Sequence, residues 1–388
     1  NNSMIKNIGI DITDLDPNYY GGSDTYSNGL IDGLIKNNSK HTYQVYLRKN
    51  YFENRRHYKS KKIKYLIFEY TLFEKIMLKL YNRLFPIISI ITGDLKYKID
   101  YVMRNLINQR LTNLISKNSE ILMVPNVLLP SYNLKIKSIL NIQDIQHLHY
   151  PNFFSAIEKL RRNYLYHNSI RYSSSLIFSS NFIKKDVMKH FDVKKKNMTI
   201  IPEGINLAEF TKINKYKKNK FKNYFFFPAQ LWKHKNHLLV IKAFNYFNKK
   251  NDFKYTLVMC GKSFISSKDI LNEIMKCQNC HYLGVIDKSS LINLYRNSIA
   301  TISPALYESS SLTILEALAC GSKIIASKTE PNLERKKFNV LYFNKNSYKD
   351  LAKQFKNSLK KTENKVKKNE IKRFDWKNIS KEWLEKSI

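Results

Sequence analysis

Cysteine is scarce in this sequence, and it contains no long apolar run. Four cysteines among 388 residues cannot form the disulfide framework of a small secreted protein. The best apolar stretch, residues 84–92, is half of the roughly 18 residues needed to span a bilayer. The first residues also lack the basic segment followed by an apolar one that marks a secretory signal. We therefore expect a cytoplasmic protein with reduced thiols.

Metal-binding motifs are similarly rare. Cys277 and Cys280 form a C-x-x-C sequence next to His281, a spacing found in zinc and redox sites. A second pair of ligands is missing, and two cysteines cannot fill the four positions around a structural zinc ion. Cys260 and Cys320 lie in apolar contexts that are typical of small core residues. We therefore predict no metal site.

Acidic residues are few: the chain has 31 Asp and Glu compared with 67 Lys and Arg, which gives a formal net charge of +36. Such a charge favours polyanions, either nucleic acid or an anionic membrane face. The excess is spread along the chain, with 31 basic and 16 acidic residues in 1–206 (net +15) and 36 and 15 in the remainder (net +21). No helix-turn-helix, zinc-finger or RNA-binding motif accompanies it. The charge alone therefore identifies no partner, and a basic nucleic-acid-binding protein stays an alternative.

Short apolar runs alternate with helical periodicity along the chain. This alternation predicts an α/β protein with parallel sheets covered by helices on both faces. In the first half we expect strands at residues 6–13, 43–47, 64–68, 121–124, 138–142, 175–179 and 198–201, and helices at 24–36, 72–84, 97–117, 156–172 and 181–191.

A polar stretch rich in lysine and asparagine, residues 206–223, interrupts the alternation and is the expected linker. We therefore expect two domains, 1–206 and 207–372, each a doubly wound parallel sheet, with a ligand in the cleft between their carboxyl edges. In the second half the expected strands are 224–227, 255–260, 281–283, 299–302, 323–326 and 340–343, and the expected helices are 237–247, 268–276, 289–296, one after residue 311 and two near the C-terminus.

The most informative stretch is YESSSLTILEALACG, residues 307–321, which lies between two expected strands. A strand, a turn of small residues and a helix present free backbone N–H groups to a phosphate. The hydroxyls of Ser309, Ser310 and Ser311 can cap the helix. Glu308 and Glu316 lie eight positions apart around this turn, and carboxylates accept paired hydrogen bonds from vicinal diols. The pattern suits a nucleotide sugar.

This string resembles the E-x7-E signature of family 4 retaining glycosyltransferases, and the resemblance extends over nearly the whole chain. It implies the GT-B fold, with two Rossmann-like domains facing across a cleft, the first binding the acceptor and the second the donor. It also implies that the last helix, in 373–388, crosses back to the first domain. The departure is at the three serines, where the family usually has glycines. A positive φ would cost more at serine than at glycine.

Other segments resemble donor-binding parts of that family. Gly21 and Gly22 take the place of the glycine pair after the first strand, near the donor phosphate or the acceptor. Lys235 takes the place of the lysine that neutralises the leaving diphosphate. Gln230 stands where an arginine is common, and Lys233 is a possible substitute for its charge. The remaining expected donor contacts are Val285 and Ile286 at the base, and the backbone amides of Leu312 and Thr313.

The acceptor side is expected on the loop after residue 142. The family commonly has His-Asp where this chain has Gln143 and Asp144, and His147 and His149 lie nearby. Asp144 can position an acceptor hydroxyl or the donor sugar, although a loop aspartate is otherwise a turn former. We therefore predict Asp144, His147 and His149 as acceptor-binding residues.

The resemblance implies transfer with retention of configuration but shows no obvious nucleophile. We therefore favour same-face attack, in which Lys235 and the amides of residues 309–313 stabilise the leaving diphosphate and Glu308 orients the sugar. No cofactor or metal is required besides the nucleotide-sugar substrate. The acceptor is a saccharide or a lipid-linked saccharide of glycan assembly. A GT-B sugar epimerase is an alternative that the pairing of Lys235 with E-x7-E disfavours.

A basic and apolar surface is expected in the first domain. It combines an amphipathic run, residues 72–83, with a cluster of Arg55, Arg56, Lys59, Lys61, Lys62 and Lys64. Such a surface could rest on an anionic leaflet and meet a lipid-linked acceptor. A solvated face over a packed helix is the alternative interpretation.

Overall fold

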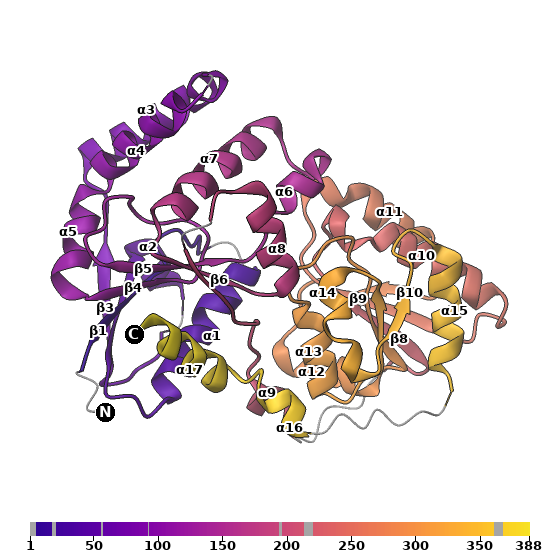
Figure 1. Ribbon diagram of the computed structural model, residues 1–388. Coiled ribbons are helices and arrows are strands. Elements are labelled where there is room, and N and C mark those ends of the chain that lie inside the picture. The colour runs from indigo at the N-terminus through magenta and orange to yellow at the C-terminus, as the bar shows by residue number, and fades with distance from the viewer. Residues whose placement is uncertain are drawn as a thin grey trace. The chain divides into compact units, whose positions relative to one another are not determined.

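The computed structural model describes residues 5–17, 21–55, 57–91, 93–193, 196–212, 220–360 and 368–388 (Figure 1). Arg56 and residues 213–219 of the expected linker lie outside these ranges. The chain divides into two compact units. The N-terminal unit consists of the residues up to Gly204 together with Trp376–Ile388. The C-terminal unit is Ile205–Asp375. The boundaries expected from the sequence were at 206/207 and 372/373.

The N-terminal unit is built on a seven-stranded parallel sheet, in the order β3-β2-β1-β4-β5-β6-β7. The order reverses direction between β1 and β4, which is the doubly wound arrangement expected from the alternation. Its strands are β1 (Asn7–Asp11), β2 (Thr42–Arg48), β3 (Ile63–Phe68), β4 (Ile121–Val124), β5 (Lys137–Ile142), β6 (Ser175–Phe178) and β7 (Asn197–Ile200).

The helices of this unit differ from expectation in four places, one of which is the short helix α6, which was not anticipated. A short α2 was not anticipated, and α3 extends past residue 84 with Pro86 inside it. The single helix expected at 97–117 is two helices, because Asn108 leaves helical angles and its side-chain amide donates to the Arg104 carbonyl. The helices are α1 (Gly22–Lys36), α2 (Lys49–Asn54), α3 (Leu72–Ile90), α4 (Leu95–Ile107), α5 (Gln109–Asn118), α6 (Gln146–His149), α7 (Ala156–Tyr172), α8 (Asn181–His190) and α17 (Trp376–Ser387).

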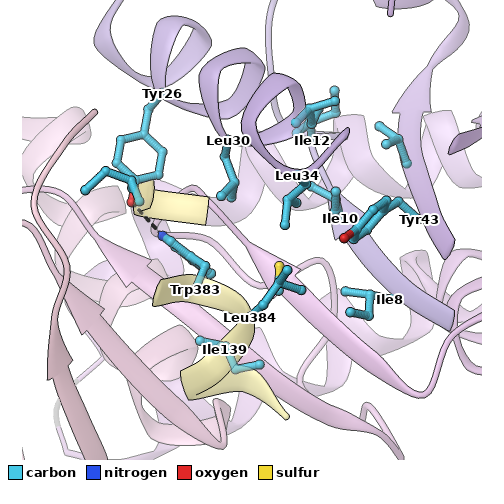
Figure 2. Close-up of a cluster of buried hydrophobic side chains, with 14 of the residues drawn as sticks. Ile8, Ile10, Ile12, Tyr26, Leu30, Leu34, Tyr43, Ile139, Trp383 and Leu384 are labelled. Atoms are coloured by element: carbon cyan, nitrogen blue, oxygen red, sulfur yellow. Dashed lines mark hydrogen bonds between the residues drawn. The ribbon is translucent and has the colours of Figure 1, made fainter. Parts of the chain in front are cut away.

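The last helix, α17, packs against α1 and completes the core of the N-terminal unit (Figure 2). Trp383 is fully buried there, and its indole N–H donates to the Tyr26 hydroxyl at 3.0 Å. Trp376 fits only because glycine lies opposite, since a Cβ on Gly29 would come within 2.1 Å of its ring. The C-terminal residues are therefore an integral part of the first sheet's core.

The C-terminal unit contains a six-stranded parallel sheet in the order β10-β9-β8-β11-β12-β13. Its order reverses between β8 and β11. Its strands are β8 (Tyr224–Pro228), β9 (Thr256–Cys260), β10 (Cys280–Tyr282), β11 (Ala300–Ser303), β12 (Ile324–Ser327) and β13 (Leu341–Phe343). Its helices are α9 (Leu207–Thr211), α10 (His237–Lys249), α11 (Lys268–Lys276), α12 (Lys288–Asn297), α13 (Leu312–Ala319), α14 (Glu330–Leu333), α15 (Tyr348–Ser358) and α16 (Lys368–Lys372).

Two cysteines correct the expectation of four reduced thiols. Cys277 ends α11 and Cys280 opens β10, and the turn between them brings their Cα atoms to 5.4 Å, where they form a disulfide. Cys260 is buried and Cys320 is partly buried, and both are free thiols. Within the described ranges, no three His, Cys, Asp or Glu side chains are grouped so that they could hold a metal ion. Nor does any helix in these ranges have the length and apolar character to cross a membrane.

Candidate active site

The candidate site of the C-terminal unit lies at the carboxyl ends of β8 and β11, where the strand order reverses. Ligands of doubly wound sheets bind at this position, because the loops after the two strands diverge to opposite faces. The two loops are joined here. The Leu306 N–H donates to the His234 carbonyl at 2.8 Å, and the Asn236 amide donates to the Pro304 carbonyl at 3.3 Å.

Lys235 and Glu308 come together on these loops. The ammonium Nζ of Lys235 lies 2.7 Å from the carboxylate Oε1 of Glu308, and their side chains are 24% and 15% exposed. Lys235 is held by a short 3-10 turn, Lys233–Lys235, which ends at Asn236 in a left-handed conformation with φ 62°. The sequence singled out both residues, and the structure joins them in one ion pair. A phosphate arriving at this edge would meet a cation that is already oriented.

The three serines, called the serine loop (Ser309–Ser311), lead into α13. Ser311 is the N-cap residue of α13 and has φ 55° and ψ 65°, the left-handed region that favours glycine. The prediction that these hydroxyls cap the helix is wrong for Ser311, because its Oγ donates to Asn332 Oδ1 instead. The first N–H groups of an α-helix have no intrahelical acceptor, so the helix start remains suited to an anion.

Asn332 and Arg335, which the sequence analysis missed, hold the serine loop from behind. Asn332 is fully buried, and its amide also donates to the Ser327 carbonyl at 2.8 Å. Arg335 is 6% exposed, and its Nη2 donates to the Ser310 carbonyl and hydroxyl at 3.2 and 3.0 Å. Glycines in the loop would adopt the left-handed conformation of Ser311 without strain. Here, contacts from outside the loop hold the serines in place. Both residues lie more than 20 positions further along the chain, and no local motif marks them.

Glu316 lies on α13, with its carboxylate turned toward α12. The Tyr295 hydroxyl donates to its Oε2 at 2.8 Å, and Lys288 Nζ lies 3.8 Å from its Oε1. Burial raises the pKa of Glu316, while Lys288 and Tyr295 oppose that rise. The side chain is therefore a fixed, largely desolvated acceptor, and its contact with a diol stays a prediction.

The other donor-side candidates of this unit lie on neighbouring loops. The Gln230 amide oxygen accepts from the Trp232 indole N–H at 2.7 Å, and Trp232 stacks on Phe264 with ring centroids 3.9 Å apart. Val285 is 75% exposed on the loop after β10, whereas Ile286 packs on the core. Their contact with a base stays a prediction.

The glycine pair of the N-terminal unit lies at the start of α1. Gly21 is the N-cap residue in extended conformation, and a Cβ on Gly22 would meet nothing within 4 Å. The next residue, Ser23, donates from its hydroxyl to Gln143 Oε1 at 2.8 Å. The glycine turn and the loop after β5 therefore meet at the carboxyl edge of this sheet.

The three predicted acceptor-binding residues occupy different environments. Asp144 accepts from the Gln146 N–H at 3.0 Å, and its side chain is 37% exposed. His147 is 2% exposed and is hydrogen-bonded to Asn163, and burial lowers the pKa of His147 to about 4. His149 pairs with Asp186 at 2.5 Å and is one-third exposed. Asp144 and His149 are thus accessible, while His147 is a neutral core residue.

In the comparison with known protein families, the matching residues lie in the C-terminal unit. Residues 209–374 match the family Glycosyl transferases group 1. This region is a group 1 glycosyltransferase domain. It contains the Lys235–Glu308 pair, the serine loop and its supports, and Glu316. The glycosyltransferase domain therefore coincides with nearly all of the C-terminal unit.

One curated relative aligns with the chain over 222 residues at 24% identity, the O-antigen chain mannosyltransferase RfbU of Salmonella typhimurium. The alignment covers 56% of this chain and 60% of the relative's own length. The chain thus matches less than two thirds of that protein's length.

Solved structures align with both units. A sucrose-phosphate synthase from Thermosynechococcus elongatus has a TM-score of 0.73 at 15% identity and covers 98% of each chain. The HepE protein of Anabaena, solved with UDP and glucose, has a TM-score of 0.67 at 14% identity and 99% coverage of each. These likenesses show the fold. The chain has the GT-B fold, in which the glycosyltransferase domain is the second of two Rossmann-like parallel-sheet units.

Proposed function

We propose that the protein transfers a sugar from a nucleoside-diphosphate sugar to a saccharide or lipid-linked acceptor, with retention of configuration and without a metal ion or cofactor. The observation that carries the proposal is the Lys235–Glu308 pair, 2.7 Å apart at the reversal point of the sheet and next to the start of α13. A cation, a carboxylate and a row of helix N–H groups at one edge suit a substrate that joins a diphosphate to a polyol.

The donor is bound through its phosphates and its hydroxyls. The backbone amides of residues 309–313 and the Lys235 ammonium hold the diphosphate, and Glu308 accepts hydrogen bonds from the sugar. Glu316 takes the ribose diol. Gln230 completes the phosphate contacts on this unit, and Val285 and Ile286 meet the base.

The reaction proceeds by attack on the same face of the sugar. The bond from the anomeric carbon to the diphosphate breaks, the bond to the acceptor oxygen forms, and the acceptor proton passes to the departing diphosphate oxygen. Lys235 stabilises the negative charge that grows on the leaving group, which lowers the barrier of the step. Asp144 and His149 orient the acceptor hydroxyl.

The fold relatives suggest the order in which donors are tested. HepE was solved with UDP and glucose, a trehalose-6-phosphate protein from E. coli was solved with UDP-2-fluoro glucose, and the curated relative is a mannosyltransferase. UDP, UDP-glucose and a mannose donor are therefore the first ligands to try. We infer a cytoplasmic reaction in glycan assembly at an anionic membrane face.

The test is the rise in melting temperature that UDP, GDP, ADP, CMP and their sugars produce at physiological ionic strength. A ligand at a hundred times its Kd stabilises the folded state by about 2.7 kcal/mol. We expect one nucleotide family to stabilise the wild type, with Lys235→Ala and Glu316→Ala losing most of that rise relative to their own ligand-free melting temperature.

The matched control is Lys249→Ala, an exposed lysine in the last turn of α10. It removes the same charge from the same unit and should leave the rise intact. Equal losses in the control and in Lys235→Ala would contradict the proposed phosphate contact. No stabilisation by any nucleotide would contradict the proposed function as a whole.

A further inference from the structure

Exposed apolar side chains are concentrated on one pair of helices. Among the described residues, 22 large hydrophobic side chains are exposed, and nine of them lie on α3 and α4. In Figure 1 these two helices project away from the sheet of the N-terminal unit. The exposed side chains of α3 are Leu72, Phe73, Ile76, Leu80, Leu84 and Ile87, between 48% and 76% accessible. Soluble proteins rarely leave so many together without a partner.

The six side chains share one face of α3. With 3.6 residues per turn, the positions 72, 76, 80, 84 and 87 recur about once per turn and form a continuous stripe. The opposite face carries Tyr81 and Phe85, which are buried in a cluster with residues of α4 and α7. The folding of the unit therefore already uses one apolar face of α3, and the stripe is a second apolar face that the packing leaves uncovered.

The edge of the stripe is basic. Lys75, Lys79 and Arg83 are exposed and follow one another at intervals of four residues, which places them in a row beside the stripe. The only acidic residue of α3, Glu74, is 6% exposed and is paired with Arg110 at 2.8 Å. The accessible charge of α3 is therefore entirely positive.

We propose that the apolar stripe of α3 and its basic edge bind an anionic lipid bilayer, with the helix lying in the plane of the interface. The apolar stripe would enter the boundary between headgroups and acyl chains, and the three basic side chains would extend to the lipid phosphates. The charge favours this occupant, because an anionic bilayer presents phosphates directly beside an apolar interior, which matches an apolar stripe with a basic edge. The inference deepens the membrane contact proposed above and does not depend on the transferase reaction.

The binding of purified full-length protein to vesicles tests the proposal. The vesicles are phosphatidylcholine alone or an equal mixture with phosphatidylglycerol, at physiological ionic strength. One variant, Lys75→Gln/Lys79→Gln/Arg83→Gln, removes the basic row. Each basic residue near such a surface contributes about fivefold to binding, so this variant should bind the mixed vesicles about a hundredfold more weakly. A second variant, Leu72→Ser/Ile76→Ser/Leu80→Ser, should lose more than a hundredfold, because its stripe can no longer enter the interface.

Helix α15 offers a matched control. Lys349, Lys353 and Lys356 form a similar exposed basic row, but none of the exposed large hydrophobics in the described residues lies on α15. Changing these three to glutamine should alter binding less than threefold. An equal loss in the control would show that charge alone causes retention and would overturn the assignment to α3.

Two further results would overturn the proposal. One is a wild type that does not bind the mixed vesicles. The other is a wild-type dimer that the serine variant dissociates, since a second copy would then cover the stripe. Unchanged melting temperatures exclude misfolding as the cause of a loss. The nucleotide-induced rise, measured on the same variants, separates a failed membrane site from a failed transferase site.

Discussion

Replacing Asn332 with alanine should loosen the serine loop and weaken donor binding. The Asn332 side chain is fully buried and connects three groups: it accepts from Ser311 Oγ, and its amide donates to the Ser327 carbonyl at 2.8 Å and to the Ser327 hydroxyl at 3.2 Å. Each such bond contributes about 1 kcal/mol, and a buried group left without a partner costs about 1–3 kcal/mol. We expect a loss of about 3 kcal/mol in the free energy of unfolding.

The coupling between Asn332 and Ser311 tests the reasoning more sharply than the single change. Ser311 has φ 55°, which costs a non-glycine residue about 1–2 kcal/mol. In the wild type, Ser311→Gly removes that strain but also removes the bond to Asn332, so the net change should be within about 1 kcal/mol. In the Asn332→Ala background the same change removes strain and an unpaired buried hydroxyl together, and it should restore about 2 kcal/mol.

The assay is a double-mutant cycle by chemical denaturation, with the nucleotide-induced rise in melting temperature measured on all four proteins. Asn248→Ala is the control, because Asn248 is also buried and bonds the Tyr255 backbone at 3.0 and 3.1 Å, away from the loop. It should cost similar stability and show no coupling to Ser311→Gly. If the Asn332 and Ser311 changes add within about 0.5 kcal/mol, then Asn332 does not hold the strained serine in place.

Two further predictions concern pH and packing. Burial lowers the pKa of His237 to about 3 and the pKa of His234 to about 2. Both histidines are protonated in the unfolded chain below about pH 6.5, so stability should fall as the pH drops below that value, by about 2 kcal/mol per histidine at pH 5. His237→Leu should remove its share of the slope, and an unchanged slope between pH 7.5 and 5 would contradict this assignment. Gly29→Ala should lower the unfolding free energy by about 3 kcal/mol, because the new methyl group meets Trp376 at 2.1 Å. Gly22→Ala, where a Cβ meets nothing within 4 Å, is its control, and equal effects would refute the steric account.

The strands could be predicted closely from the sequence. The strand expected at 121–124 is β4 (Ile121–Val124), and the strand expected at 138–142 is β5 (Lys137–Ile142). Strands of a parallel sheet are buried on both faces, so each reads as a continuous apolar run bounded by polar residues. The GT-B fold inferred from this alternation and from the E-x7-E resemblance is confirmed by the solved structures that align with both units.

Some local features could not be predicted because side chains outside the helical pattern decide them. The break between α4 and α5 depends on Asn108, whose side chain competes for a backbone carbonyl within an otherwise uniform helical stretch. The disulfide of Cys277 and Cys280 depends on the turn after α11, which the spacing of the cysteines allowed but did not require.

The strands, most of the helices, the division into two sheets and the residue types available at the site could be read from the sequence. Periodicity, turn residues and the E-x7-E string act over a few positions, so they can be read along the chain. The strain expected for serines in place of glycines could be read in the same way, and the structure shows positive φ at Ser311. The tertiary structure alone decided which of these residues meet. Lys235 and Glu308 are 73 positions apart, and they pair because β8 and β11 are neighbours in the sheet. The supports of the serine loop, Asn332 and Arg335, come from beyond the next strand for the same reason. Contacts of this kind depend on strand order, and strand order results from the packing of the whole unit rather than from any local pattern.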